Sequence, residues 1–433
     1  MPLGIALLRG LLGVATILGI AYALSSNRKA IVWRTVGVGM LLQVVFALFV
    51  IKTPWGASLF EAIGTGFARL VGFTQEGVAF VFGEQLAKSS GSAGFVFAFQ
   101  ILPTIIFFGA FTSVLYHLGI LQVIVRAVGT VMAKTMRLSG AESLSAAGNI
   151  FLGQTEAPLL VKPFVKTMTR SELFALMVGG MATLAGGVLA SYIVLLGGDD
   201  PVARAQFAKS LLAASIMNAP AALFLAKMMV PELGEPLTRG NTKLESEKVA
   251  SNVIEAAANG ASEGLQLSLN VGAMLLAFIA LIALLNAMLG WVGSNTGLDG
   301  LIAGWSGGAF TNLSFQSIFG FLFAPFAWLI GIESRDILQF GSLLGIKVSV
   351  NEFVAYLQLA GLEGTMTPRS VTMATYALCG FANFSSIAIQ IGGVGGLAPE
   401  RRGEIAALGL KAVIAGSLAT AMSATLAGIL LST

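Results

Sequence analysis

Eight long apolar stretches dominate the sequence, and each has about the 20 residues that a helix needs to cross a bilayer. They cover residues 4–24, 31–51, 95–120, 173–196, 207–230, 271–292, 371–392 and 408–431. The chain is 56% hydrophobic and only 11% charged, whereas a soluble domain carries about 25% charged residues. Because so apolar a chain would expose large sticky surfaces to water, we predict an all-α polytopic membrane protein with eight transmembrane helices.

The same composition excludes several classes of protein. Soluble enzymes and nucleic-acid-binding proteins do not have this hydrophobicity. The single cysteine, Cys379, excludes a disulfide framework, and the single histidine, His117, leaves no histidine-based metal cluster or Ser-His-Asp arrangement. We therefore expect no enzyme activity and no organic cofactor. The net charge of +4 is interpreted as a signal of membrane topology.

The basic residues define that topology. Sixteen of the 25 Lys and Arg residues lie on one side of the eight-span arrangement. They are found in residues 28–34, 126–170, 227–248 and 401–411. Cytoplasmic loops carry an excess of Lys and Arg. This rule predicts that these loops face the cytoplasm, that both termini lie outside, and that the protein resides in the cytoplasmic (inner) membrane.

Two further apolar segments do not fit as simple crossings. Residues 141–164 have basic residues on both sides, and a crossing here would invert every later loop. We therefore predict a re-entrant hairpin that enters from the cytoplasm. For residues 310–362, two crossings or none preserve the topology equally well, but Lys347 and Glu352 within the second apolar run favour a second re-entrant hairpin.

The more polar segments are predicted to lie at the membrane surface. Residues 54–90 mix apolar and charged side chains, which is typical of an interfacial helix. Residues 231–263 form the most polar stretch, a predicted cytoplasmic connector. In its later part, residues 252–267, apolar side chains recur at helical spacing, and we expect this part to lie along the membrane surface.

A faint internal repeat relates the two halves of the chain. Residues 154–156 are followed after about thirty residues by a Gly-containing segment inside an apolar span, and residues 349–352 are followed in the same way. Met-Ala-Thr precedes both Gly-containing segments, at residues 181–183 and 373–375, and Gly-Gly follows both, at residues 197–198 and 392–393. Paired interrupted helices in corresponding positions of two halves point to the central site of a transporter.

Two carboxylates inside apolar segments are the strongest candidates for function. A charge at the centre of a bilayer costs roughly 2.5–3.5 kcal/mol even on the insertion scale. Glu156 lies between Gly153 and Pro158 in the first hairpin. The alternative is a purely structural carboxylate that pairs with Lys162 or with the backbone. Glu352 lies in the second hairpin, where a pair with Lys347 would need an unfavourable spacing of five residues.

A third polar group lies in the seventh span. Asn383 and Ser386 are three residues apart, so on one helix face they would form a donor–acceptor pair for vicinal hydroxyls. Hydrogen bonding between helices is the alternative role. No arginine occurs in any of these motifs. The set therefore indicates a neutral polyhydroxylated or heterocyclic solute rather than an anion.

At these motifs the sequence resembles the concentrative nucleoside transporter family. The resemblance covers essentially the whole chain and is carried by residues 153–159, 252–261, 350–356 and 379–386. It implies a homotrimer whose protomers have eight spans, two opposed re-entrant hairpins, an inverted repeat, a scaffold and an elevator-type transport domain. The expected division is scaffold in residues 1–140, transport domain in 141–230, connector and scaffold in 231–335, and transport domain again in 336–433.

The resemblance also implies a site. Gln154 and Thr155 would bind the nucleobase, with Glu156 nearby through water. Val188 and Phe381 would pack against base and sugar, and Glu352, Asn383 and Ser386 would hold the ribose hydroxyls. The implied sodium site consists of Asn149, Leu152, Thr183 and Leu184, although serine is the residue expected where this chain has Thr183.

The function predicted from the sequence is therefore sodium-driven import of a uridine-like nucleoside. Two alternatives remain open. One is a proton-coupled carrier of a nucleoside or another neutral solute, with Glu156 or Glu352 as the protonated group. The other is a passive channel, which the two carboxylates and the opposed hairpins disfavour.

Overall fold

The computed structural model describes residues 3–87, 94–240, 250–362 and 364–432. Within these ranges the chain is helical, and its only β-type contact is an isolated bridge between Ser139 and Arg239. The fold is thus the all-α fold predicted from the sequence.

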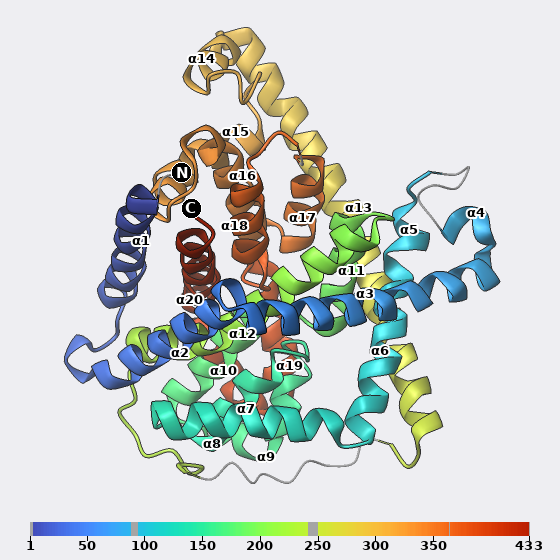
Figure 1. Cartoon of the computed structure of the whole chain (residues 1–433). Coiled ribbons are helices and arrows are strands. Elements are labelled where there is room, and N and C mark those ends of the chain that lie inside the picture. Colours follow the sequence, from blue (N-terminus) through green and yellow to red (C-terminus); the bar gives the residue numbers. More distant parts are fainter. Residues whose placement is uncertain (1–2, 88–93, 241–249, 363, 433) are drawn as a thin grey trace.

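The elements follow one another along the chain and are numbered in Figure 1. They are α1 (Leu3–Ala23), η1 (Arg28–Ala30), α2 (Trp33–Lys52), α3 (Pro54–Phe82), α4 (Glu84–Ala87), α5 (Phe97–Gln100), α6 (Leu102–His117), α7 (Ile120–Met136), α8 (Gly140–Gly148), η2 (Ala157–Val161), α9 (Lys162–Val165), α10 (Arg170–Ala182), α11 (Gly186–Gly197), α12 (Pro201–Met229), α13 (Val253–Thr296), α14 (Leu298–Trp305), α15 (Phe315–Leu329), η3 (Ser334–Asp336), α16 (Ile337–Ser349), α17 (Glu352–Gly361), α18 (Pro368–Leu378), α19 (Phe384–Leu397), η4 (Pro399–Arg401) and α20 (Arg402–Leu430).

Seven stretches of the described chain are helical, long and apolar enough to cross a membrane, and they match seven of the eight predicted spans. The remaining predicted span, residues 371–392, is divided into the shorter helices α18 and α19. The span at residues 173–196 is likewise divided into α10 and α11. Both interruptions fall in the paired positions where the sequence repeat predicts them.

The two predicted hairpins lie at opposite ends of the molecule. We call the segment from α8 to α9 hairpin 1 and the segment from α16 to α17 hairpin 2. In Figure 1, hairpin 1 lies at the lower end beside α7, and hairpin 2 lies at the upper end, where both chain termini are also found. Each hairpin is followed by an interrupted helix and then by a long helix, α12 or α20. This order is the repeat predicted from the sequence.

The later part of the connector is helical and continuous with the span that follows it. The helix α13 includes residues 253–267 and is 44 residues long in all. The position of residues 252–267 along the membrane surface stays a prediction. The Asn252 side chain caps the first turn by accepting a hydrogen bond from the Glu255 N–H at 2.9 Å, and the helix contains no proline. At 1.5 Å per residue α13 is about 66 Å long, roughly twice the thickness of the hydrocarbon core.

Glycines bring α13 and α6 into backbone contact. A Cβ atom on Gly109 would lie 2.5 Å from the carbonyl oxygen of Gly260, and one on Gly264 would lie 2.8 Å from that of Ile105. Such close approach is how small residues stabilise helix pairs in lipid, where no hydrophobic force acts between helices. Figure 1 shows the two helices side by side.

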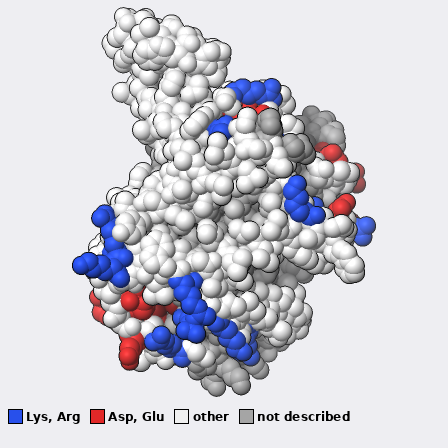
Figure 2. Space-filling view, turned by 60° about the vertical axis from the view of Figure 1, so that its left-hand side comes forward, with Lys and Arg blue, Asp and Glu red and all other residues white. Residues whose placement is uncertain are grey.

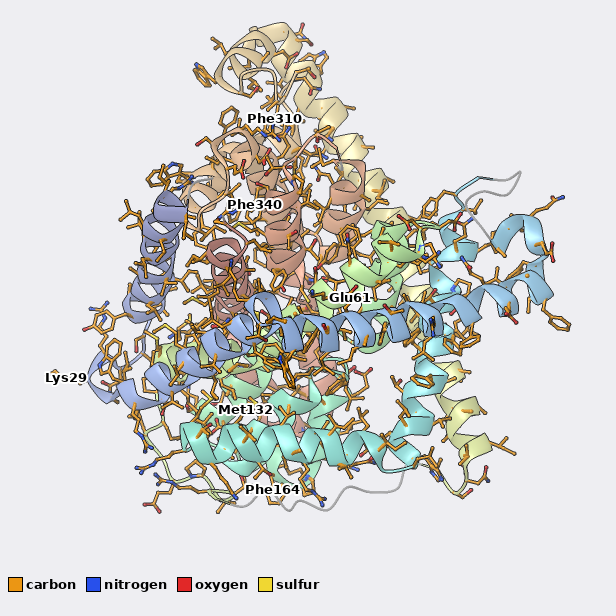
Figure 3. The ribbon with its side chains drawn as sticks, in the orientation of Figure 1. Lys29, Glu61, Met132, Phe164, Phe310 and Phe340 are labelled. Carbon is orange, nitrogen blue, oxygen red and sulfur yellow. The ribbon has the colours of Figure 1, made fainter. Side chains whose placement is uncertain are left out.

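Burial separates an inner from an outer group of helices. In the most apolar 18 residues of each span, the buried share is 83% for α10–α11, 89% for α12 and 78% for α20. The corresponding share is only 6% for α13 and 28% for α1. Figure 3 shows the Phe340 side chain among the upper helices and Lys29 at the outer edge. On the face in Figure 2, charged side chains form small groups separated by large uncharged areas. The outer helices therefore present apolar side chains to the surroundings, as a membrane protein requires.

Candidate functional site

The two interrupted helices cross at the centre of the inner group. The N–H of Phe381 donates a hydrogen bond to the carbonyl oxygen of Thr183 at 3.3 Å. Gly380 allows this approach, because a Cβ atom there would lie 2.8 Å from the carbonyl carbon and oxygen of Ala182. The residues between α10 and α11 thus contact those between α18 and α19 directly.

One buried amide joins the two crossing segments. Asn218 of α12 donates hydrogen bonds from Nδ2 to the carbonyl oxygens of Ala182 at 2.8 Å and Cys379 at 2.7 Å. Its Oδ1 accepts a hydrogen bond from Ser423 of α20. Because the last carbonyls of a helix lack partners within that helix, one side chain satisfies both helix ends.

At the tip of hairpin 1, Gln154 is hydrogen-bonded to α19 and packs against Gly180 of α10. Its Nε2 donates to Ser386 Oγ of α19 at 3.1 Å, and its Oε1 accepts from Gln390 Nε2 at 3.2 Å. Gln390 also donates to the carbonyl oxygen of Met177 in α10 at 2.9 Å. A neutral network of amides and a hydroxyl therefore surrounds the hairpin tip.

At the tip of hairpin 2, Glu352 occupies the corresponding position. Its Oε1 accepts a hydrogen bond from the hydroxyl of Tyr192 at 2.9 Å, and its Oε2 accepts one from Asn383 Nδ2 at 3.0 Å. Tyr192 belongs to α11, and Asn383 precedes α19. The carboxylate is buried and is satisfied by donors from both interrupted helices.

Two local details of these residues can be compared with the sequence expectations. Asn383 and Ser386 meet at the start of α19, where Asn383 is the N-cap and its Oδ1 accepts the Ser386 N–H at 2.8 Å. The alternative of an ion pair between Glu352 and Lys347 is wrong. Lys347 instead donates to the carbonyl oxygen of Ala377 at 2.7 Å and to Thr420 Oγ1 at 2.9 Å.

The other predicted solute residues lie around this network. Thr155 is half-buried, and its methyl group packs against α19 at Gly393. Val188 is buried and Phe381 is half-buried at the crossing. Glu156 is set apart from the network, because its side chain is exposed and folds back over Gly153.

The predicted sodium residues meet where hairpin 1 packs against α10. Asn149 is fully buried, and neither polar atom of its side-chain amide has a hydrogen-bond partner in the described part of the chain. A Cβ atom on Gly179 would lie 3.3 Å from its Nδ2. Thr183 Oγ1 donates to the Gly179 carbonyl oxygen at 2.9 Å, and Leu184 is buried while Leu152 is half-buried. A buried oxygen without a partner is costly, and neutral oxygen atoms beside an interrupted helix fit an alkali cation.

Sequence reasoning missed three residues of this centre: Tyr192, Asn218 and Gln390. Gln390 had a usable signal, because it follows Ser386 by four residues and so lies on the same face of α19. Tyr192 is one of only five tyrosines in the chain and lies inside an apolar run, and Asn218 lies likewise inside an apolar span. A lone polar side chain in a span indicates a partner but does not indicate which one.

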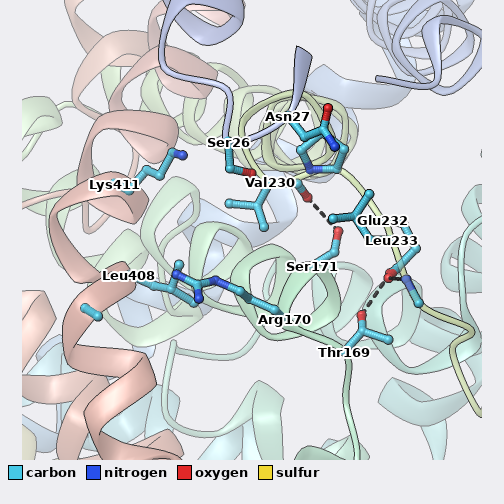
Figure 4. A pocket seen from close by; sticks show the side chains of 13 residues that line it. Ser26, Asn27, Thr169, Arg170, Ser171, Val230, Glu232, Leu233, Leu408 and Lys411 are labelled. Atoms are coloured by element: carbon cyan, nitrogen blue, oxygen red, sulfur yellow. Dashed lines mark hydrogen bonds between the residues drawn. The ribbon is translucent and has the colours of Figure 1, made fainter. Parts of the chain in front are cut away.

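A separate cavity lies away from these residues. A cavity of about 670 Å³ is lined by residues of the predicted cytoplasmic end, including Arg170, Glu232 and Lys411. In Figure 4, Thr169 is hydrogen-bonded to Glu232, and Ser171 to the carbonyl oxygen of Val230. None of the predicted solute or sodium residues lines this cavity. Its charged lining also does not match the neutral network at the hairpin tips.

Two interrupted helices that cross inside a bundle of apolar spans, with a hairpin tip at each, define a multi-pass membrane transporter. Models of the Na+ dependent nucleoside transporter N-terminus and C-terminus match residues 12–85 and 210–428, and a nucleoside recognition model matches residues 98–199. The chain therefore belongs to the Na+-dependent nucleoside transporter family. The family resemblance predicted from the sequence is confirmed, and the chain is a transporter and not an enzyme.

Individual relatives agree with this assignment. An uncharacterized transporter of Haemophilus influenzae is 46% identical over 430 residues and covers 98% of each chain. Sodium/nucleoside cotransporter 1 of Mus musculus is 40% identical over 434 residues, covering 96% of this chain and 63% of the relative. Among solved structures, CNTnw in an inward-facing substrate-bound state superimposes with a TM-score of 0.87 at 41% identity over 98% of each chain. A CNTnw variant in an outward-facing state gives 0.89 at 40% identity over 99% of each chain.

Proposed function

We propose that this protein is a sodium-coupled symporter that imports nucleosides, with the solute bound between the two hairpin tips and the crossing helices. The observation that carries the proposal is the pairing of Gln154 with Ser386 and of Glu352 with Asn383, at 3.1 and 3.0 Å. One residue of each pair comes from a hairpin and the other from the start of α19. A solute that takes over these hydrogen bonds would bind both hairpins at once.

The chemistry of the network suits a nucleoside. The Glu352 carboxylate accepts hydrogen bonds from Tyr192 and Asn383. Its two oxygens have about four acceptor sites, so vicinal ribose hydroxyls can replace Asn383 while Tyr192 stays in place as a donor. Gln154 offers a donor and an acceptor side by side, which match the polar edge of a nucleobase, and Thr155 lies next to it. Ser386, released from Gln154, would complete the contacts to the ribose.

The remaining solute residues have supporting roles. Val188 and Phe381 supply apolar surface for the base and the sugar. Glu156 lies outside the hydrogen-bonded network, so its contact with the base is proposed to run through water. This arrangement disfavours an anionic solute, because Glu352 is a carboxylate and the residues hydrogen-bonded to it and to Gln154 are neutral.

Sodium binding at Asn149, Leu152, Thr183 and Leu184 would couple to solute binding through hairpin 1. Asn149 and Gln154 are five residues apart in the same tip, so an ion that orders Asn149 also orders Gln154 and Thr155. Coupling of this kind is reciprocal, and sodium and nucleoside would each raise the affinity for the other. The unpartnered amide of Asn149 supports this assignment.

An elevator mechanism follows from the distribution of burial. The hairpins and the strongly buried helices α10–α12 and α18–α20 form the proposed transport domain, residues 141–230 and 336–433. The outer helices, from residues 1–140 and 231–335, form the proposed scaffold, which would hold a homotrimer in the inner membrane with both termini outside. The contact between Gln43 of α2 and Ser423 of α20, at 2.9 Å, would then break when the transport domain moves.

Uptake of radiolabelled uridine into proteoliposomes tests the proposal. Sodium and proton gradients are imposed separately, with choline replacing sodium in the control. We expect concentrative uptake with the sodium gradient alone. Uptake driven only by a proton gradient would favour the proton-coupled carrier, and uptake that no gradient concentrates would indicate a channel.

A further inference from the structure

Lys347 is a buried cation that the proposed function leaves without a role. Its side chain is 1% exposed, in α16 of hairpin 2. The ammonium donates to the carbonyl oxygen of Ala377 at 2.7 Å and to Thr420 Oγ1 at 2.9 Å. It also interacts electrostatically with Glu352. A buried charge is costly and is retained only where it is paired or hydrogen-bonded, so its position calls for an explanation.

The ammonium joins three elements of the second repeat. Lys347 comes from the first arm of hairpin 2, and Thr420 lies in the long helix α20. Ala377 lies in the last turn of α18, which is the first half of the interrupted helix. The corresponding elements of the first repeat are α8, α10 and α12. In that repeat, the same three elements meet at Asn149 and the next residue, Ile150.

The contacts around Asn149 show this correspondence. Asn149 is the C-cap of α8 and lies against Gly179 of α10. The next residue, Ile150, accepts a hydrogen bond from Ser215 Oγ of α12 at 3.1 Å. At this junction, the described part of the first repeat therefore has a buried amide without a hydrogen-bond partner and no cationic side chain. At the corresponding junction, the second repeat has the cationic side chain of Lys347.

We propose that the ammonium of Lys347 is a built-in cation in the second repeat, at the position that corresponds to the sodium site of the first repeat. The tip of hairpin 1 is then ordered by an ion that binds and dissociates, and the tip of hairpin 2 is ordered permanently by the lysine side chain. This inference rests on the proposed sodium symport. It limits each protomer to one sodium ion bound at the hairpin tips and assigns Lys347 as the positioning residue for Glu352.

Replacement of the charge tests the inference in proteoliposomes. Lys347→Met removes the ammonium but keeps much of the volume, and we expect uridine uptake to fall by roughly tenfold or more at every sodium concentration. Lys347→Ala also opens space at the junction. For this variant we expect uptake to recover when sodium or methylammonium is raised, and the Hill coefficient for sodium to rise from about one to about two. Lys411→Ala is the matched control, since it removes a lysine of α20 outside the hairpin tips and should transport normally.

The outcomes separate a cation from a simple hydrogen-bond donor. Lys347→Ala protein that keeps its oligomeric size, transports poorly and does not respond to sodium or methylammonium would overturn the inference. Normal uptake by Lys347→Met would also overturn it. If neither variant folds, the sodium dependence of the unmodified protein decides, because two cooperative sodium ions contradict a built-in cation. Uptake by the unmodified protein without any sodium would contradict the proposed function itself, and no sodium site would then exist for Lys347 to match.

Discussion

The hydroxyl of Tyr192 donates a hydrogen bond to Oε1 of Glu352 at 2.9 Å. Tyr192 follows the interruption in the helix of the first repeat, and Glu352 begins the second arm of hairpin 2. The ring is packed against Tyr356 and Phe353, with centroid separations of 4.3 and 4.9 Å. The contact therefore joins the two repeats at the proposed ribose position.

Removal of this hydroxyl should weaken nucleoside binding and leave the fold intact. In Tyr192→Phe the ring contacts remain, and Glu352 loses one donor. A hydrogen bond to a charged group contributes about 1.5–3 kcal/mol, and each 1.4 kcal/mol is tenfold in affinity. We expect the KM for uridine uptake to rise by about tenfold or more, with Tyr22→Phe, a partly exposed tyrosine of α1, as the control. An unchanged KM would show that Tyr192 does not position the carboxylate.

Neutralisation of the carboxylate should have a larger effect. Glu352→Gln keeps the size of the side chain but turns one acceptor oxygen into a donor that faces Tyr192 or Asn383. We expect uridine uptake to be lost while the protein keeps its oligomeric size in size-exclusion chromatography. Glu61→Gln in α3, outside the hydrogen-bonded network, is the control and should transport normally. Normal uptake by Glu352→Gln would contradict the proposed ribose site.

Loss of the unpartnered amide should affect sodium more than nucleoside. In Asn149→Ala the proposed ion loses a side-chain oxygen ligand, so the sodium concentration for half-maximal uptake should rise several-fold. The maximal rate at very high sodium should be less affected, because the Gln154 and Glu352 networks remain. Ser143→Ala, which removes another buried side-chain oxygen of α8 without a partner in the described structure, is the control. A sodium dependence that is unchanged in Asn149→Ala would exclude this residue as a ligand.

The spans, the interrupted helices and the positions of both hairpins are predictable because apolar length, basic residues and glycine are local signals. The partners of the polar residues are not. Tyr192 and Asn218 lie in apolar helices and Gln390 shares a face of α19 with Ser386, but only the crossing of α10–α11 with α18–α19 decides what these three side chains face. The same limit explains Asn383, whose position at the first turn of α19 depends on where the interruption ends.

The crossing itself depends on Gly380, which gives the last prediction. In Gly380→Ala the new Cβ atom would lie 2.8 Å from the backbone of Ala182, and backbone cannot move aside as a flexible side chain can. Overpacking of this kind costs about 1–3 kcal/mol, so thermal unfolding in detergent should begin at a lower temperature. Gly392→Ala in α19 is a matched control, because a Cβ atom there would meet no neighbouring group of the described chain within 4 Å and alanine favours a helix. We expect this variant to be at least as stable as the parent protein. Equal stability of the two variants would mean that the interrupted helices do not need their backbones in contact.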